Sequence, residues 1–172
     1  MTGAGASPGV PPAAARAGTS SGPVMVVGYG NSLRSDDGVG PAVAARLAGD
    51  PRMAGVVIRS EHQLTPELAA DASGASLLVL VDAGTDEAPG EVSVRRLEPV
   101  IDGAGTAWTH HLDPSALVGL ARELWGSAPP VVLVSIGPAS LAVGEGLSEI
   151  VAPAVTRAAD LVATVVEAHR RA

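Results

Sequence analysis

Three short segments are apolar at almost every position: residues 24–27 (VMVV), 77–81 (LLVLV) and 131–136 (VVLVSI). Each is too short for a globular helix and is rich in valine and leucine. Strands buried on both faces have such continuous apolar sequences, so the pattern predicts the inner strands of a parallel sheet. Residues 55–60 are predicted as a further strand. Residues 90–97 alternate less cleanly, which is typical of an edge or antiparallel strand.

Helical patterns fall between these strands, at residues 40–48, 65–72 and 113–125. A fourth follows the last strand at residues 148–169, where Pro153 can kink or reset the first turn. Two of them open with Thr or Asp followed by proline, a favourable helix start. The alternation of strands and helices predicts a three-layer α/β/α domain with a mostly parallel, twisted central sheet. Ligands of such sheets bind outside the carboxyl ends of the strands, so the residues that follow each strand are the first candidates for a site.

The predicted domain spans residues 23–172. The first 22 residues are a mixture of Gly, Ala, Pro and Ser that can bury little apolar surface, and a disordered tail is therefore expected there. They lack the basic start and continuous apolar core of a signal peptide. No apolar segment reaches the roughly 20 residues that cross a bilayer. These features predict a cytoplasmic protein without membrane insertion.

Composition removes several kinds of chemistry. The formal net charge is −7, which argues against nucleic acid as a partner. All 11 basic residues are arginines, so a Schiff-base lysine or a lysine general base is excluded. The chain has no cysteine, which excludes disulfides, thiolate catalysis and cysteine-bound zinc.

The stretch GYGNSLRSDDGVG, which begins at Gly28, follows the first predicted strand. A dinucleotide-binding loop has the pattern G-x-G-x-x-G, in which the third glycine allows close packing of helix and strand. Gly28 and Gly30 fit that pattern, but the third position is Leu33. A P-loop needs a lysine, and Asp36 and Asp37 would repel a phosphate. The pattern therefore argues against a nucleotide site.

Two interpretations of the adjacent aspartates remain. Acidic residues at a helix N-terminus stabilise it by about 0.3–1 kcal/mol each, which accounts for one aspartate better than for two. The alternative is a site, because Asp82 directly follows another buried strand, and His110 and His111 precede the helix predicted from residue 113. Two carboxylates and an imidazole form a ligand set that suits a divalent transition metal.

Four motifs occur in order along residues 24–169: G-x-G-N-x-L-x-x-D-D-x-x-G, VDAG, THHLDPSAL and VSIGPASLAVGEGLS. Together they resemble the hydrogenase maturation endopeptidases. These proteases remove the C-terminal extension of the large subunit of nickel–iron hydrogenases. The resemblance covers nearly all of the chain except its predicted tail, and four ordered motifs are far more specific than one glycine-rich loop.

The resemblance implies that Asp37, Asp82 and His110 contact the metal and are catalytic. His111 lies beside His110, and either could be the ligand; we prefer His110. Asp37 and Asp82 are both candidates for the general base. The resemblance also implies that nickel arrives with the precursor and is not held permanently by the protease.

Further residues near the same strand ends are expected to contact the substrate. Glycines permit a close approach of another backbone, and polar residues follow both the first and the second predicted strand. His62 could be a surface residue, a substrate contact or an extra ligand. The expected substrate contacts are Gly28, Gly30, Asn31, Asp36, His62, Gln63 and His111.

The function that the resemblance implies is cleavage of a nickel-loaded large-subunit precursor. The residues agree with it, since no nucleophile-elbow motif and no cysteine are present, and hydrolysis would need a water activated by a metal or a carboxylate. Two alternatives are a non-catalytic nickel-sensing chaperone of the precursor and a small-molecule enzyme on an ordinary α/β sheet.

Overall fold

The computed structural model describes residues 21–98 and 112–172. Its sheet has five strands in the order β2-β1-β3-β5-β4. Four strands are parallel, and β4 pairs with β5 in the antiparallel direction. The predicted fold class is confirmed, and so is the edge position of the strand predicted at 90–97. The strands are β1 (Val24–Tyr29), β2 (Val57–Glu61), β3 (Leu77–Ala83), β4 (Val92–Leu97) and β5 (Val131–Ile136).

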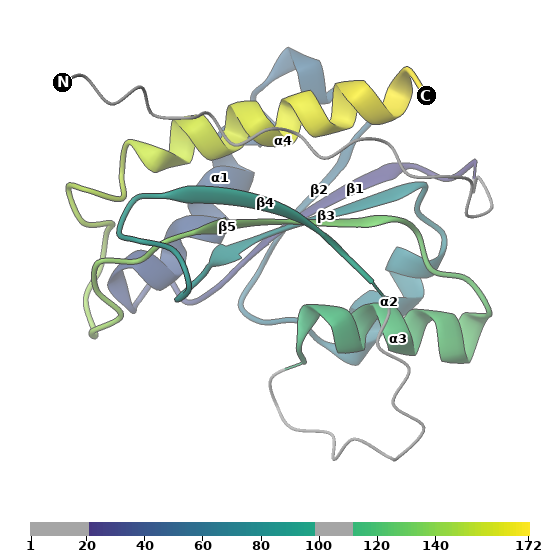
Figure 1. The fold of residues 1–172 in the computed structure, drawn as a ribbon, viewed down its shortest axis with the longest axis horizontal. Helices are drawn as coiled ribbons and strands as arrows, with labels where there is room; N and C mark the ends of the chain where they lie inside the picture. Colours follow the sequence, from purple (N-terminus) through teal and green to yellow (C-terminus); the bar gives the residue numbers. More distant parts are fainter. Residues whose placement is uncertain (1–20, 99–111) are drawn as a thin grey trace, which may run out of the picture.

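Helices cover both faces of the sheet. Figure 1 shows α4 on one side of the strands and α3 on the other. The α-helices are α1 (Val39–Ala48), α2 (Pro66–Ser73), α3 (Pro114–Trp125) and α4 (Ala154–Arg170), and short 3-10 turns occur at η1 (Ser35–Gly38) and η2 (Pro51–Met53). No helix among these described residues is long and apolar enough to span a membrane.

The core consists of two apolar layers. Every residue of β1 and β5 is buried, as their continuous apolar sequences require. On one face Val26 and Val79 pack with residues of α1 and α4. On the other face Val27 and Leu80 pack with residues of α2 and α3. Successive strand residues therefore alternate between the two layers.

The helices begin where their capping residues allow. The Asp113 carboxylate accepts a hydrogen bond of 2.8 Å from the backbone N–H of Ser115, and α3 starts at Pro114. The last helix starts at Ala154, later than predicted, with Pro153 as its N-cap. The preceding residues form turns, because proline disfavours helical backbone at the residue before it. Ser148 is held by the loop contacts described below.

The sheet order creates a topological switch point between β1 and β3, and we call the region outside the carboxyl ends of these two strands the crevice. These neighbouring strands are parallel, but α1, which follows β1, covers one face, whereas α2, which leads into β3, covers the other. Ligands of open α/β sheets bind at such topological switch points, outside the carboxyl ends of the strands. The residues after β1 and at the end of β3 therefore meet where a site is expected.

Residues 1–20 lie outside the described part of the chain, so the disordered tail remains a prediction. The domain boundary at residue 23 likewise stays a prediction; the first strand starts at Val24.

Candidate functional site

The first of the two adjacent aspartates is buried inside the protein. Asp36 has no exposed surface. Its Oδ2 accepts hydrogen bonds from the backbone N–H groups of Ala139 (2.9 Å) and Ser140 (3.0 Å) and from the Ser148 hydroxyl (2.9 Å). Its Oδ1 accepts one of 2.7 Å from the Ser148 N–H. Burial opposes the charge, but these four donors outweigh it and lower the Asp36 pKa.

This position changes the interpretation of Asp36. Neither η1 nor α1 receives a side-chain cap, so helix capping does not explain the aspartate pair. The sequence predicts that Asp36 contacts substrate, but its carboxylate is buried and occupied by the chain's own donors. It instead fixes the segment 139–148 against the start of α1.

Neighbouring residues extend this attachment. The Arg34 guanidinium donates to the Leu141 carbonyl at 3.2 and 3.3 Å. The Ser35 N–H donates to the carbonyl of Gly144 at 2.8 Å. Ser35 has a φ of 48°, a strained conformation for a non-glycine residue that these contacts maintain. The last of the four sequence motifs, which contains residues 141 and 144, is therefore hydrogen-bonded to the first, which contains residues 34 and 35.

The second aspartate faces the crevice. Asp37 is only partly buried, and its Oδ2 accepts a hydrogen bond of 2.9 Å from the Asn31 N–H. The Asn31 side-chain carbonyl in turn accepts one of 2.9 Å from the Leu33 N–H. Asn31 therefore shapes the turn that presents Asp37, and its side-chain oxygen is already engaged.

Asp82 lies at the end of β3, beside Asp37. Its Oδ1 accepts a hydrogen bond of 2.7 Å from the Ala83 N–H, and the Tyr29 hydroxyl donates a second hydrogen bond to the carboxylate. The pKa of Asp82 is raised to about 6, mainly by burial and also by the negative charges of Asp37 and Glu87, although the two hydrogen bonds act to lower it. The structure thus brings together the two predicted carboxylates.

Glu87 is a third carboxylate that the sequence analysis missed. It receives a hydrogen bond from the Ser93 hydroxyl, and a side chain at Gly84 would collide with it. Glu87 and Thr85 form one wall of a hollow of about 350 Å³ beside the crevice, and residues 138–141 form the other. No motif marks Glu87, because only the sheet order places the loop between β3 and β4 next to the end of β5.

The glycines of the first motif allow tight packing of the chain itself. A Cβ at Gly28 would lie 2.0 Å from the Gly40 carbonyl oxygen, and one at Gly30 would lie 1.9 Å from that of Asp37. Gly30 also has a φ of 137°. The space beside these glycines is filled by the protein's own backbone, so we assign them to packing in place of the expected substrate contact.

The remaining predicted residues are only partly placed. His62 and Gln63 follow β2 at the same edge of the sheet, and both are exposed. The three alternatives for His62 and the substrate contact of Gln63 stay predictions. His110 and His111 lie outside the described residues. The described chain resumes at Leu112. Burial raises the pKa of Tyr29, and the negative charges of Asp82 and Asp113 raise it further.

Asp37 and Asp82 can supply oxygen ligands to a divalent cation, and the predicted imidazole belongs to the segment that is not described. Within residues 21–98 and 112–172 no group of three or more His, Asp or Glu side chains is arranged to hold a metal ion. The described residues thus provide two of the three groups that the resemblance implied.

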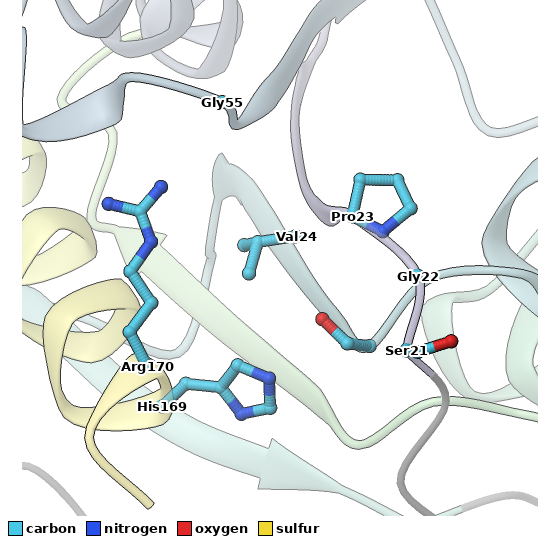
Figure 2. Close-up of a pocket in the computed structure, with 8 residues that line it drawn as sticks. Ser21, Gly22, Pro23, Val24, Gly55, His169 and Arg170 are labelled. Atoms are coloured by element: carbon cyan, nitrogen blue, oxygen red, sulfur yellow. The ribbon is translucent and has the colours of Figure 1, made fainter.

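A second hollow, of about 370 Å³, lies at the opposite edge of the sheet, where β1 begins. Figure 2 shows His169 and Arg170 of α4 on one side of it and Ser21 and Pro23 on the other. Burial and the charge of Arg96 lower the His169 pKa. None of the predicted site residues lies here.

The fold and the crevice define a class: a three-layer α/β protein with paired carboxylates at the topological switch point of its sheet. No family model and no curated protein match the chain. Solved structures of hydrogenase maturation proteases do share its fold, which confirms the resemblance drawn from the four motifs.

Three of these structures illustrate the similarity. The maturation protease HycI from Thermococcus kodakarensis KOD1 is 28% identical, with a TM-score of 0.59 over 84% of this chain and 92% of its own. A hydrogenase 2 maturation peptidase from a Thaumarchaeota archaeon is 27% identical, with a TM-score of 0.63 over 84% and 97%. The Escherichia coli endopeptidase HybD is 24% identical, with a TM-score of 0.68 over 84% of this chain and 93% of its own.

Proposed function

We propose that this protein is an endopeptidase that removes the C-terminal extension of a nickel-loaded nickel–iron hydrogenase large-subunit precursor. The observation that supports this most directly is the convergence of Asp37 and Asp82 at the crevice between β1 and β3. Asp82 is partly desolvated, and Asp37 and Glu87 act on its pKa. The fold that surrounds this pair is shared with hydrogenase maturation proteases of 27–28% identity.

The two carboxylates have different environments, which favours different roles in hydrolysis. The raised pKa of Asp82, about 6, suits a group that takes up and releases a proton near neutral pH. Asp37 is held by the turn at Asn31 and is suited to contact the metal and orient the scissile segment. Nickel carried by the precursor would polarise the peptide carbonyl or the attacking water.

We further propose that nickel enters the site with the precursor. Two carboxylates and one histidine, without a thiolate, are few ligands for a permanent site. The metal would then mark the precursor as ready and complete the coordination that positions the bond to be cut. The proposed setting is the cytoplasm, with no nucleic acid partner and no insertion into a membrane.

The test uses enzyme that has been treated with a chelator and desalted. We expect it to cut nickel-loaded precursor and to leave nickel-free precursor intact, measured by gel shift and mass spectrometry. Cleavage of the nickel-free precursor, or loss of activity that zinc restores, would assign the chain to the ordinary metalloproteases. Binding of loaded precursor without any cutting would support the nickel-sensing chaperone instead.

Two histidine variants test the part of the site outside the described residues. His110→Ala is expected to stop precursor cleavage, because it removes the proposed imidazole ligand. His111→Ala is expected only to weaken cleavage, and it serves as the control of equal size and adjacent position. The reverse ranking in the same cleavage assay would shift the ligand assignment by one residue.

A further inference from the structure

Tyr29 occupies a position that none of the sequence motifs assigns. It is the last residue of β1, is 9% exposed, and is the only tyrosine in the chain. In the pairing of β1 with β3, Gly28 lies opposite Val81. The next residues along these parallel strands, Tyr29 and Asp82, therefore lie side by side where both strands end.

Strand alternation places both side chains on the same face of the sheet. Val27 and Leu80, two residues earlier on the same strands, pack in the apolar layer beneath α2 and α3, and the Tyr29 ring belongs to that layer too. Asp82 must therefore point toward this layer, where a charge is poorly solvated. The Tyr29 ring is buried among apolar groups while its hydroxyl reaches the carboxylate.

A buried phenol and a desolvated carboxylate each need a hydrogen-bond partner. The Tyr29 hydroxyl donates to Asp82, so the two groups satisfy each other. The charges of Asp113, the N-cap of α3, and Arg95 of β4 also act on this phenol. Tyr29, at the end of β1, thus lies beside the end of β3, although the sequence separates these two strands widely.

We propose that Tyr29 is a positioning residue, whose hydroxyl fixes the orientation of the Asp82 carboxylate toward the substrate. The Ala83 N–H binds the carboxylate from its own backbone, and the phenol binds it from the neighbouring strand. Two donors from different strands leave the side chain one orientation, whereas the backbone contact alone leaves it free to rotate. Hydrogen bonds that orient a metal-contacting residue commonly change activity by about 10–100-fold.

The effect on catalysis rests on the proposed function, but the contact itself can be tested separately. Since Tyr29 is the only tyrosine, a protein labelled with ¹³C at the phenol carbon gives a single tyrosine resonance. The substitution Asp82→Ala is expected to move this resonance, because the phenol loses its acceptor. Leu78→Val is the matched control: it alters packing on the same face of β3 and should leave the resonance in place.

The kinetic experiment uses Tyr29→Phe, which keeps the ring and removes only the hydroxyl. We expect kcat on nickel-loaded precursor to fall about 10–100-fold, with KM within about twofold of the wild-type value. Leu78→Val should lower the melting temperature and keep kcat.

The outcomes separate the two proposals. A tyrosine resonance that Asp82→Ala does not move would overturn the role of Tyr29, whether or not the wild-type protein cleaves precursor. An unchanged kcat in Tyr29→Phe would overturn it as well. If the resonance moves but the wild-type protein does not cleave nickel-loaded precursor, the contact stands and the proposed function fails.

Discussion

The side chains of the adjacent residues Asp36 and Asp37 point in different directions and have different hydrogen-bond partners. Asp36 is turned inward to the segment 139–148, and Asp37 is turned outward to the crevice. A carboxylate can accept hydrogen bonds at both oxygens, whereas an amide side chain has only one oxygen to accept them. The donors around residue 36 therefore require a carboxylate there, whereas at residue 37 the proposed site chemistry would require one.

The first residue-scale prediction compares Asp36→Asn with Asp37→Asn. The amide introduced at position 36 would direct an N–H₂ group at backbone N–H donors, so a loss of roughly 2–4 kcal/mol in the free energy of unfolding is expected. Asp37→Asn should lower the free energy of unfolding by less than about 1 kcal/mol, and it should abolish precursor cleavage. Urea unfolding and a cleavage assay on folded protein measure both effects. Equal losses of stability in the two variants would contradict this division of roles.

The second prediction concerns the pH dependence of stability. The folded-state pKa of Asp82 is raised to about 6 from 3.8, mainly by burial. Between these values the folded protein binds more protons than the unfolded chain, so this residue makes the free energy of unfolding fall as pH rises. Asp82→Asn should remove the effect and be more stable than wild type by roughly 2–3 kcal/mol at pH 7.

Urea unfolding of wild type and Asp82→Asn at about pH 4, 5.5 and 7, which span the two pKa values, measures this difference. The variant's advantage should be small at the lowest pH and grow toward neutral pH. An advantage that is constant across this range would show that Asp82 does not titrate there.

At the scale of elements, the packing of α1 against the sheet decides where the crevice lies. Gly40, in the first turn of α1, touches two strands at once. A Cβ at this position would lie 2.3 Å from the carbonyl oxygen of Tyr29 and 2.5 Å from that of Val81. In a dinucleotide-binding loop the third glycine allows the helix to pack closely on the strand. Here Leu33 occupies that position of the pattern, and Gly40, seven residues later, allows the close packing instead.

Gly40→Ala is accordingly expected to destabilise the protein by about 3 kcal/mol or more, because rigid backbone must move. Gly49→Ala is the control, since a Cβ there meets no atom within 4 Å. The control should stay within about 0.5 kcal/mol of wild type. Thermal unfolding followed by circular dichroism would compare them, and similar melting temperatures for the two variants would refute the packing role.

At the scale of the whole molecule, the two apolar layers and the sheet belong to residues from Val24 onward. The composition of residues 1–20 predicts a tail that contributes little to this core. A chain that starts at Ser21 should therefore keep its melting temperature within about 2 °C, which corresponds to less than about 1 kcal/mol. A larger drop in differential scanning calorimetry would show that the tail packs on the domain.

The elements themselves follow from the sequence. Continuous apolar runs and Pro-containing helix starts locate the inner strands and the helices α2 and α3. The helical pattern begins at residue 148, but α4 starts at Ala154, directly after Pro153, where the sequence already allowed the first turn to be reset. Ser148 itself is held by its contacts with Asp36. A long-range hydrogen bond leaves no periodic trace in the sequence.

The sequence by itself determined the strands, the layers and the two candidate carboxylates, because apolar runs and periodicity are properties of short segments. Only the tertiary structure decided which residues meet. It directed Asp36 inward, brought Glu87 to the edge of the crevice, and set Tyr29 beside Asp82. These contacts depend on the strand order β2-β1-β3-β5-β4. Strand order arises from how the whole chain packs, and no short stretch of residues encodes it.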